Sequence, residues 1–95
     1  MITKVSNKEV RSDKFSVLVP NIHQVIYAEG NHSASIEIEG GMSKPGEVDW
    51  IIYKDTLQNW ESPHDNQTVS ADKRDEIFER ISESLKLLQM PHRFE

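Results

Sequence analysis

The chain contains no cysteine, so neither a disulfide framework nor a thiolate metal site can form. It also lacks any apolar run close to the roughly 20 residues that a membrane-spanning helix requires. No signal peptide is visible after Met1. These absences predict a cytoplasmic protein that does not engage a membrane.

The length of the chain limits it to one domain. Its 95 residues suffice for a single thin core, and the four glycines and four prolines mark turns between patterned segments. Residues 1–14 are polar, mixed in charge and without a clear period, so we expect a loose arm or at most a short edge strand there. Residues 15–95 are expected to form one α+β domain.

The net charge of −5 is unevenly distributed along the chain. Residues 29–69 carry eight acids and two bases, a net −6, whereas residues 1–28 sum to +2 and residues 70–95 to −1. Such an acidic segment repels a phosphate backbone, so nucleic-acid binding is disfavoured. The same segment would attract a basic protein and speed its association.

Apolar side chains alternate at the two-residue period of strands over much of the chain. The clearest case is residues 33–39, where small and apolar side chains alternate with Ser35, Glu37 and Glu39. Further strands are predicted at residues 15–19, 23–28 and 48–55. The last of these carries bulky side chains on both faces, so we expect it to lie centrally or to be covered on both sides. A hairpin turn is predicted at residues 29–32, and a flexible loop at residues 40–46.

The stretch from Val69 to Met90 predicts one amphipathic helix. Ser70 is its N-cap candidate, and Pro91 should end it near Gln89. The predicted fold is an antiparallel β-meander of about four strands, with this C-terminal helix packed on one face. Residues 92–95 could add a short final strand. The expected core consists of Phe15, Val17, Val25, Tyr27, Ala34, Ile36, Ile38, Val48, Trp50 and Ile52 against Ile77, Phe78, Ile81, Leu85 and Leu88.

No pattern of catalytic or metal-ligating residues stands out. The four histidines are scattered, without the short spacings common in metal sites. Glu37 and Glu39 lie on the polar face of a half-buried strand, which indicates a solvated face and not an acid–base pair. Residues 40–46 lack the Gly-Lys-Ser/Thr ending of a phosphate loop and precede a strand. We therefore expect no enzyme activity, no metal and no cofactor.

The predicted partner-binding residues follow the acidic middle segment: Glu37, Glu39, Glu47, Asp49, Asp55, Trp60, Glu61 and Asp65. Tryptophan is enriched at binding hot spots because it buries a large area at little entropic cost. Isolated aromatic residues in loops also serve to anchor the loop to the core. Both interpretations of Trp60 stay open.

The order of the elements carries a family resemblance. A β-rich half ends in Trp60 and Pro63, a polar connector leads to a serine-capped charged helix at residues 70–81, and the chain closes with residues 87–95. Over residues 15–95 this resembles the immunity protein 74 family of bacterial polymorphic toxin systems. The resemblance implies a cytosolic inhibitor that binds a cognate protein toxin, often a nuclease, and has no catalysis of its own.

Two other functions remain as alternatives. One is a structural or regulatory module that self-associates as a homodimer, through an exposed sheet edge or through the second apolar face that holds Ile51 and Tyr53. The other is a small enzyme with its site in residues 60–65, for which no supporting acid, base or nucleophile is evident.

Overall fold

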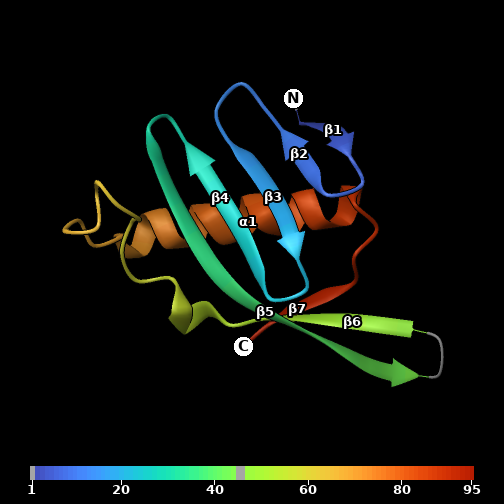
Figure 1. Cartoon of the computed structure of the whole chain (residues 1–95). Coiled ribbons are helices and arrows are strands. Elements are labelled where there is room, and N and C mark those ends of the chain that lie inside the picture. Colours follow the sequence, from blue (N-terminus) through green and yellow to red (C-terminus); the bar gives the residue numbers. More distant parts are fainter. Residues whose placement is uncertain (1, 45–46) are drawn as a thin grey trace.

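The computed structural model describes residues 2–44 and 47–95, and the side chains of these except those of residues 42–44, 47 and 48. The described part contains strands, one 3-10 helix and one α-helix (Figure 1). In chain order these are β1 (Thr3–Ser6), β2 (Glu9–Arg11), β3 (Ser16–Asn21), β4 (Gln24–Glu29), β5 (His32–Lys44), β6 (Glu47–Ile52), η1 (Lys54–Thr56), α1 (Ala71–Leu87) and β7 (His92–Phe94).

The strands form one curled sheet in the order β1 to β7. Neighbouring strands are antiparallel except β6 and β7, which are parallel. The α+β class and the single helix are confirmed, but the sheet of the described residues has seven strands instead of about four and is mixed. The parallel pair arises because α1 connects β6 to β7 and returns the chain to the end at which β6 began.

Residues 3–6 and 9–11 join the sheet. β1 and β2 form an antiparallel pair, and β2 pairs in turn with β3. Val10 on β2 is fully buried, whereas all four residues of β1 are exposed. The structure thus has two short strands where the sequence predicted an arm with one edge strand at most. Strands of three and four residues are too short to produce a recognisable alternation.

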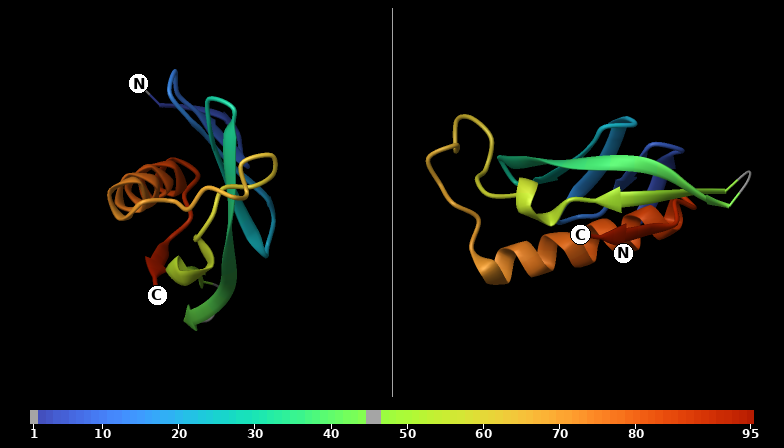
Figure 2. Two further views of the ribbon diagram at one scale, coloured as in Figure 1. Left: turned by 90° about the vertical axis from the view of Figure 1, so that its left-hand side faces the viewer. Right: turned by 90° about the horizontal axis from the view of Figure 1, so that it is seen from below.

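The helix packs against one face of the sheet. Figure 2 shows α1 on one side, with β6 and β7 curling around beneath it. The expected core is largely confirmed, although Phe15 and Trp50 lie at its half-buried margin and the side chain of Val48 is outside the described residues. The buried apolar residues of the described chain that lie outside the expected core are Val10, Val19, Leu57, Trp60 and Val69.

β5 is the longest strand and is shared by two ladders. Its residues 32–37 pair with β4, and its residues 38–44 pair with β6. The predicted loop at residues 40–46 is therefore wrong for residues 40–44, because β5 continues to Lys44 with Gly40 opposite Trp50. The rest of that prediction, residues 45–46, lies outside the described residues. The prediction that the following strand is central is confirmed, since β6 lies between β5 and β7.

Polar contacts fasten the helix to the sheet. The Ser70 hydroxyl accepts a hydrogen bond from the Lys73 amide at 3.3 Å and caps α1, as predicted. The Lys73 ammonium lies 3.1 Å from a Glu29 oxygen on β4. Arg80 donates to the Tyr27 hydroxyl at 2.7 Å, and that hydroxyl donates to Glu29 at 2.7 Å. The cluster orients α1 relative to β4.

Candidate partner-binding surface

Glu37 and Glu39 are exposed on the outer face of the sheet, where its two ladders meet. Glu37 is opposite Gln24 of β4, and Glu39 is opposite Ile51 of β6. Their neighbours Ile36 and Ile38 point inward and are buried. The alternation predicted for this strand is confirmed, so both carboxylates lie on the solvated face.

Tyr53 lies beside the second carboxylate, since its hydroxyl donates a hydrogen bond to Glu39. This bond is the main reason that the pKa of Tyr53 lies above its usual value of 10.0, because the bond favours the neutral phenol. The half-buried Ile51 lies on the outer face of β6, two residues before Tyr53, which directly follows the strand. The surface therefore combines carboxylates with part-exposed aromatic and aliphatic area.

The segment after β6 is attached to β5 by hydrogen bonds. The Tyr53 amide donates to the Glu37 carbonyl at 3.0 Å, and the Glu37 amide donates to the Thr56 hydroxyl at 3.0 Å. Further along, the Glu61 amide donates to the Ser33 carbonyl at 2.8 Å. These bonds hold the exposed Asp55 of η1 and the exposed Glu61 along the edge of β5.

The loop after η1 is built around Trp60, whose side chain is 8% exposed and belongs to the core. The Trp60 amide donates to the Gln67 carbonyl at 3.1 Å, which closes the loop. His32 meets the indole edge at 5.1 Å between ring centroids and stacks on His64 at 3.8 Å. Of the two open interpretations, the structure places Trp60 in the core. Asp65 lies exposed in the same loop, and its carbonyl accepts from the Asn59 side chain.

The two remaining predicted residues lie on β6. Asp49 pairs with Gly41 and also lines a groove beneath the end of α1. The backbone of Glu47 opens β6 opposite Lys44, and its side chain is outside the described residues. We use the name acidic surface for the exposed set on or beside β5: Glu37, Glu39, Asp55, Glu61 and Asp65.

Within the described residues, no member of the acidic surface forms an ion pair. The acids that are paired are others, namely Glu9, Glu29, Glu76 and Glu95. Glu29 illustrates the difference. Burial raises the pKa of Glu29. Hydrogen bonds from Tyr27 and Lys73 and the nearby positive charges lower it by more, so the net pKa is below the usual value of 4.5. The negative charge of the acidic surface is not neutralised in this way.

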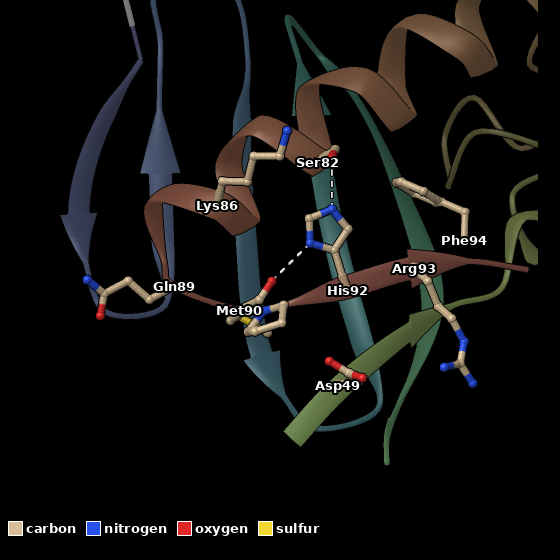
Figure 3. A pocket seen from close by; sticks show the side chains of 9 residues that line it. Asp49, Ser82, Lys86, Gln89, Met90, His92, Arg93 and Phe94 are labelled. Carbon is tan, nitrogen blue, oxygen red and sulfur yellow. Dashed lines mark hydrogen bonds between the residues drawn. The ribbon is translucent and has the colours of Figure 1, made fainter. Parts of the chain in front are cut away.

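A groove lies between α1 and β7 (Figure 3). His92 bridges its two walls, because its Nε2 lies 2.7 Å from the Ser82 hydroxyl and its Nδ1 lies 2.9 Å from the Met90 carbonyl. A carbonyl only accepts, so Nδ1 carries a proton, and in the neutral imidazole Nε2 then accepts from Ser82. The described residues hold no cluster of three metal-ligating side chains.

Comparison with known proteins decides the family. The profile of the family described as Immunity protein 74 matches residues 23–95, which is most of the chain. The chain belongs to the immunity protein 74 family. No curated protein and no solved structure matches it. The resemblance found in the sequence is thereby confirmed, with the match beginning at His23 instead of Phe15.

In this immunity protein 74 family member, some site residues escaped the sequence analysis. The sequence pattern puts Tyr53 on an apolar face, but its hydroxyl contacts Glu39, and only strand pairing brings the two together. The His32–His64 stack likewise joins residues that are 32 positions apart in the sequence, and the Ser82–His92 bond joins residues that are 10 positions apart. The alternation of residues 48–53 was a usable signal for Tyr53, since it puts Tyr53 on the same face as Asp49. Across the described residues, no helix has both the length and the apolarity needed to cross a membrane.

Proposed function

We propose that this immunity protein 74 family member binds and neutralises a cognate protein toxin in the cytoplasm, and that it has no catalysis of its own. Binding occurs through the acidic surface, with Asp49 and Glu47 of β6 at its margin. The toxin carries a complementary basic patch, as a nuclease would, since a nuclease needs basic side chains to hold a phosphate backbone.

The observation that carries the proposal is that the carboxylates of the acidic surface have no internal counter-ion among the described residues. Exposed carboxylates without a counter-ion repel one another, so an external cation gives them the largest electrostatic stabilisation. They therefore steer a basic partner and accelerate its encounter. The net charge of −6 over residues 29–69 supports the same direction of attraction.

The part-apolar character of the surroundings also supports a protein partner. Ile51 and Tyr53 lie among the carboxylates, and both are only partly buried. Ile26 and Leu18 continue this outer face on β4 and β3, opposite one another in the register. A centre of aliphatic and aromatic area with charges around it is typical of specific protein interfaces.

The first test is the coding context, where we expect a large secreted toxin gene immediately upstream. The decisive test uses the purified toxin domain from that gene and the triple variant Glu37→Lys/Glu39→Lys/Asp55→Lys. We expect its affinity for the toxin to fall by more than about tenfold, mainly through a slower association rate. The wild-type association rate should fall as salt is raised, because salt screens exposed charges.

The matched control reverses three exposed acids of α1, Asp75, Glu79 and Glu83, and so changes the net charge by the same amount. We expect this control to bind the toxin within about threefold of the wild type, because it leaves the local field at the acidic surface in place. Equal losses in the two variants would point to net charge alone. An association rate that does not depend on salt would contradict the proposal.

A further inference from the structure

β7 is an edge strand with an unused row of backbone groups. The Trp50 amide donates to the Pro91 carbonyl at 2.8 Å, and the Glu95 amide donates to the Ile52 carbonyl at 2.8 Å. Alternate residues of a strand direct their backbone groups to opposite edges, so residues 91, 93 and 95 face β6. The N–H and C=O groups of His92 and Phe94 therefore face away from the sheet. Among the described residues, none of these four groups makes a hydrogen bond.

A groove of about 700 Å³ runs along this strand. Pro91, His92, Arg93 and Phe94 all line it, so the groove follows the whole length of β7. The opposite wall is one stripe of α1 and its end, made by Ser82, Lys86 and Gln89 at helical spacing (Figure 3). An extended chain placed there would lie between a helix and a strand edge.

The side chains around the edge are held in place. The ladder with β6 aligns the backbone of His92 and Phe94, and the His92 side chain is held between the Ser82 hydroxyl and the Met90 carbonyl. Phe94 packs edge-on against Phe78 of α1 at 5.4 Å between ring centroids. The edge is thus preorganised, which lowers the entropic cost of adding another strand.

The other outer strand of the sheet is protected against such pairing. β1 carries Lys4, and its register with β2 shifts between Lys4 and Ser6. A lysine and an irregular register are two common devices that block edge pairing. β7 has a regular three-residue register with β6 and no such shift.

The charge along the groove favours an acidic occupant. Lys86 and Arg93 line it with a single acid, Asp49. Arg93 is paired with Glu95 at 2.9 Å, whereas Lys86 is exposed and forms no ion pair with any described residue. Met90 and Phe94 supply the apolar part of the lining.

We propose that the groove between α1 and the free edge of β7 binds an extended peptide segment of a partner protein as an additional strand. The segment pairs with the N–H and C=O groups of His92 and Phe94, places a carboxylate against Lys86, and places apolar side chains against Met90 and Phe94. This mode of recognition takes affinity from backbone bonds and specificity from alternate side chains. It does not depend on the toxin proposal.

The probe is a displayed library of random seven-residue peptides, selected on the full-length protein and then resynthesised. We expect the enriched peptides to alternate apolar residues with an Asp or Glu. On binding, the amides of His92 and Phe94 should become protected from hydrogen exchange. The amides of Arg93 and Glu95 serve as internal controls, because they already bond to β6 and should not change.

Two variant pairs make the test specific. His92→Pro removes both the imidazole and the N–H that faces the groove, whereas His92→Ala removes the imidazole and keeps that N–H. We expect His92→Pro to lose peptide binding by more than about tenfold and His92→Ala to retain it within about threefold, as suits a lost backbone bond. Lys86→Glu should weaken binding about fivefold, and Lys86→Gln should weaken it less. Protection of the Arg93 and Glu95 amides confirms that each variant is folded.

Several outcomes would overturn the proposal. One is a selection that enriches no peptide, and another is enriched peptides that leave the His92 and Phe94 amides unprotected. Equal loss of binding in His92→Pro and His92→Ala would assign the effect to the imidazole. Protection of the two amides that rises with protein concentration in the absence of peptide would show that a second copy of the chain occupies the groove instead.

Discussion

Gly40 of β5 lies directly against the indole ring of Trp50 on β6. A Cβ built on Gly40 would lie 3.2 Å from the Trp50 Cζ3 and 3.4 Å from its Cη2. Its neighbour Gly41 has no such restriction, since the nearest atom to its Cβ position is the Asp49 carbonyl oxygen at 3.8 Å. The two adjacent glycines therefore differ, because an added Cβ would press on a neighbouring side chain only at the first.

Substitution of the two glycines should show this difference. Gly40→Ala forces the Trp50 ring to move and should lower the free energy of unfolding by about 1 kcal/mol. Gly41→Ala meets only ordinary contact and should change it by less than about 0.5 kcal/mol. Urea unfolding of both variants gives the comparison. Equal stabilities would show that the ring does not restrict position 40.

The seam between helix and sheet should be sensitive to loss of volume. Ile81 is fully buried in the core, so Ile81→Ala should lower the free energy of unfolding by roughly 2–4 kcal/mol. Leu87 lies on the same helix and is 40% exposed, so Leu87→Ala should lower it by less than about 1 kcal/mol. Thermal or urea unfolding measures both. A small effect at Ile81 would argue against the packing of α1 on the sheet.

Acid should destabilise the protein partly through Glu29. Its pKa is lowered in the folded state, so the folded protein binds this proton less readily than the unfolded chain does. The resulting stabilisation is complete above the unfolded pKa near 4.5 and is lost as the pH falls through the lower folded value. Glu29→Gln should be less stable than the wild type at pH 7, and the difference should shrink below about pH 4. Urea unfolding across this range measures it, and a constant difference would contradict the account.

Substitution of Trp60 tests whether this residue belongs to the core or to the partner interface. Because its side chain is 8% exposed, Trp60→Phe should lower the free energy of unfolding by about 1–3 kcal/mol through incomplete filling of the core. The affinity for the toxin domain should change by less than about threefold at a temperature where the variant is folded, since exposed acids make the contacts. A loss of affinity without a loss of stability would instead place Trp60 at the interface.

Elements defined by local periodicity were predictable from the sequence. The helix follows from apolar residues on one face, from the Ser70 cap and from Pro91, all within one short segment. β4 and the first part of β5 follow from strict alternation and from Gly30, whose φ of +57° suits the turn between them. In each case, the residues that form the element also carry its pattern.

Long-range pairing was not predictable in the same way. β7 joins residues about 40 positions away in the sequence, and its three residues carry too little pattern to show a parallel partner. Gly40 and Gly41 have no side chains and so show no alternation. They belong to β5 because β6 pairs with them. The exposure of Glu37 and Glu39 followed from the pattern, but the contact of Glu39 with Tyr53 needed the register of two strands.

The way in which β5 is divided has a mechanical consequence. Glu37 belongs to the ladder with β4 and Glu39 to the ladder with β6, so the polypeptide between them is where one half of the sheet is tied to the other. A ligand that binds both carboxylates at once would link the two halves of the sheet across this junction. Pulling or protease attack that separates the halves should then become slower in the complex than in the free protein, even though the ligand touches only one side of the sheet.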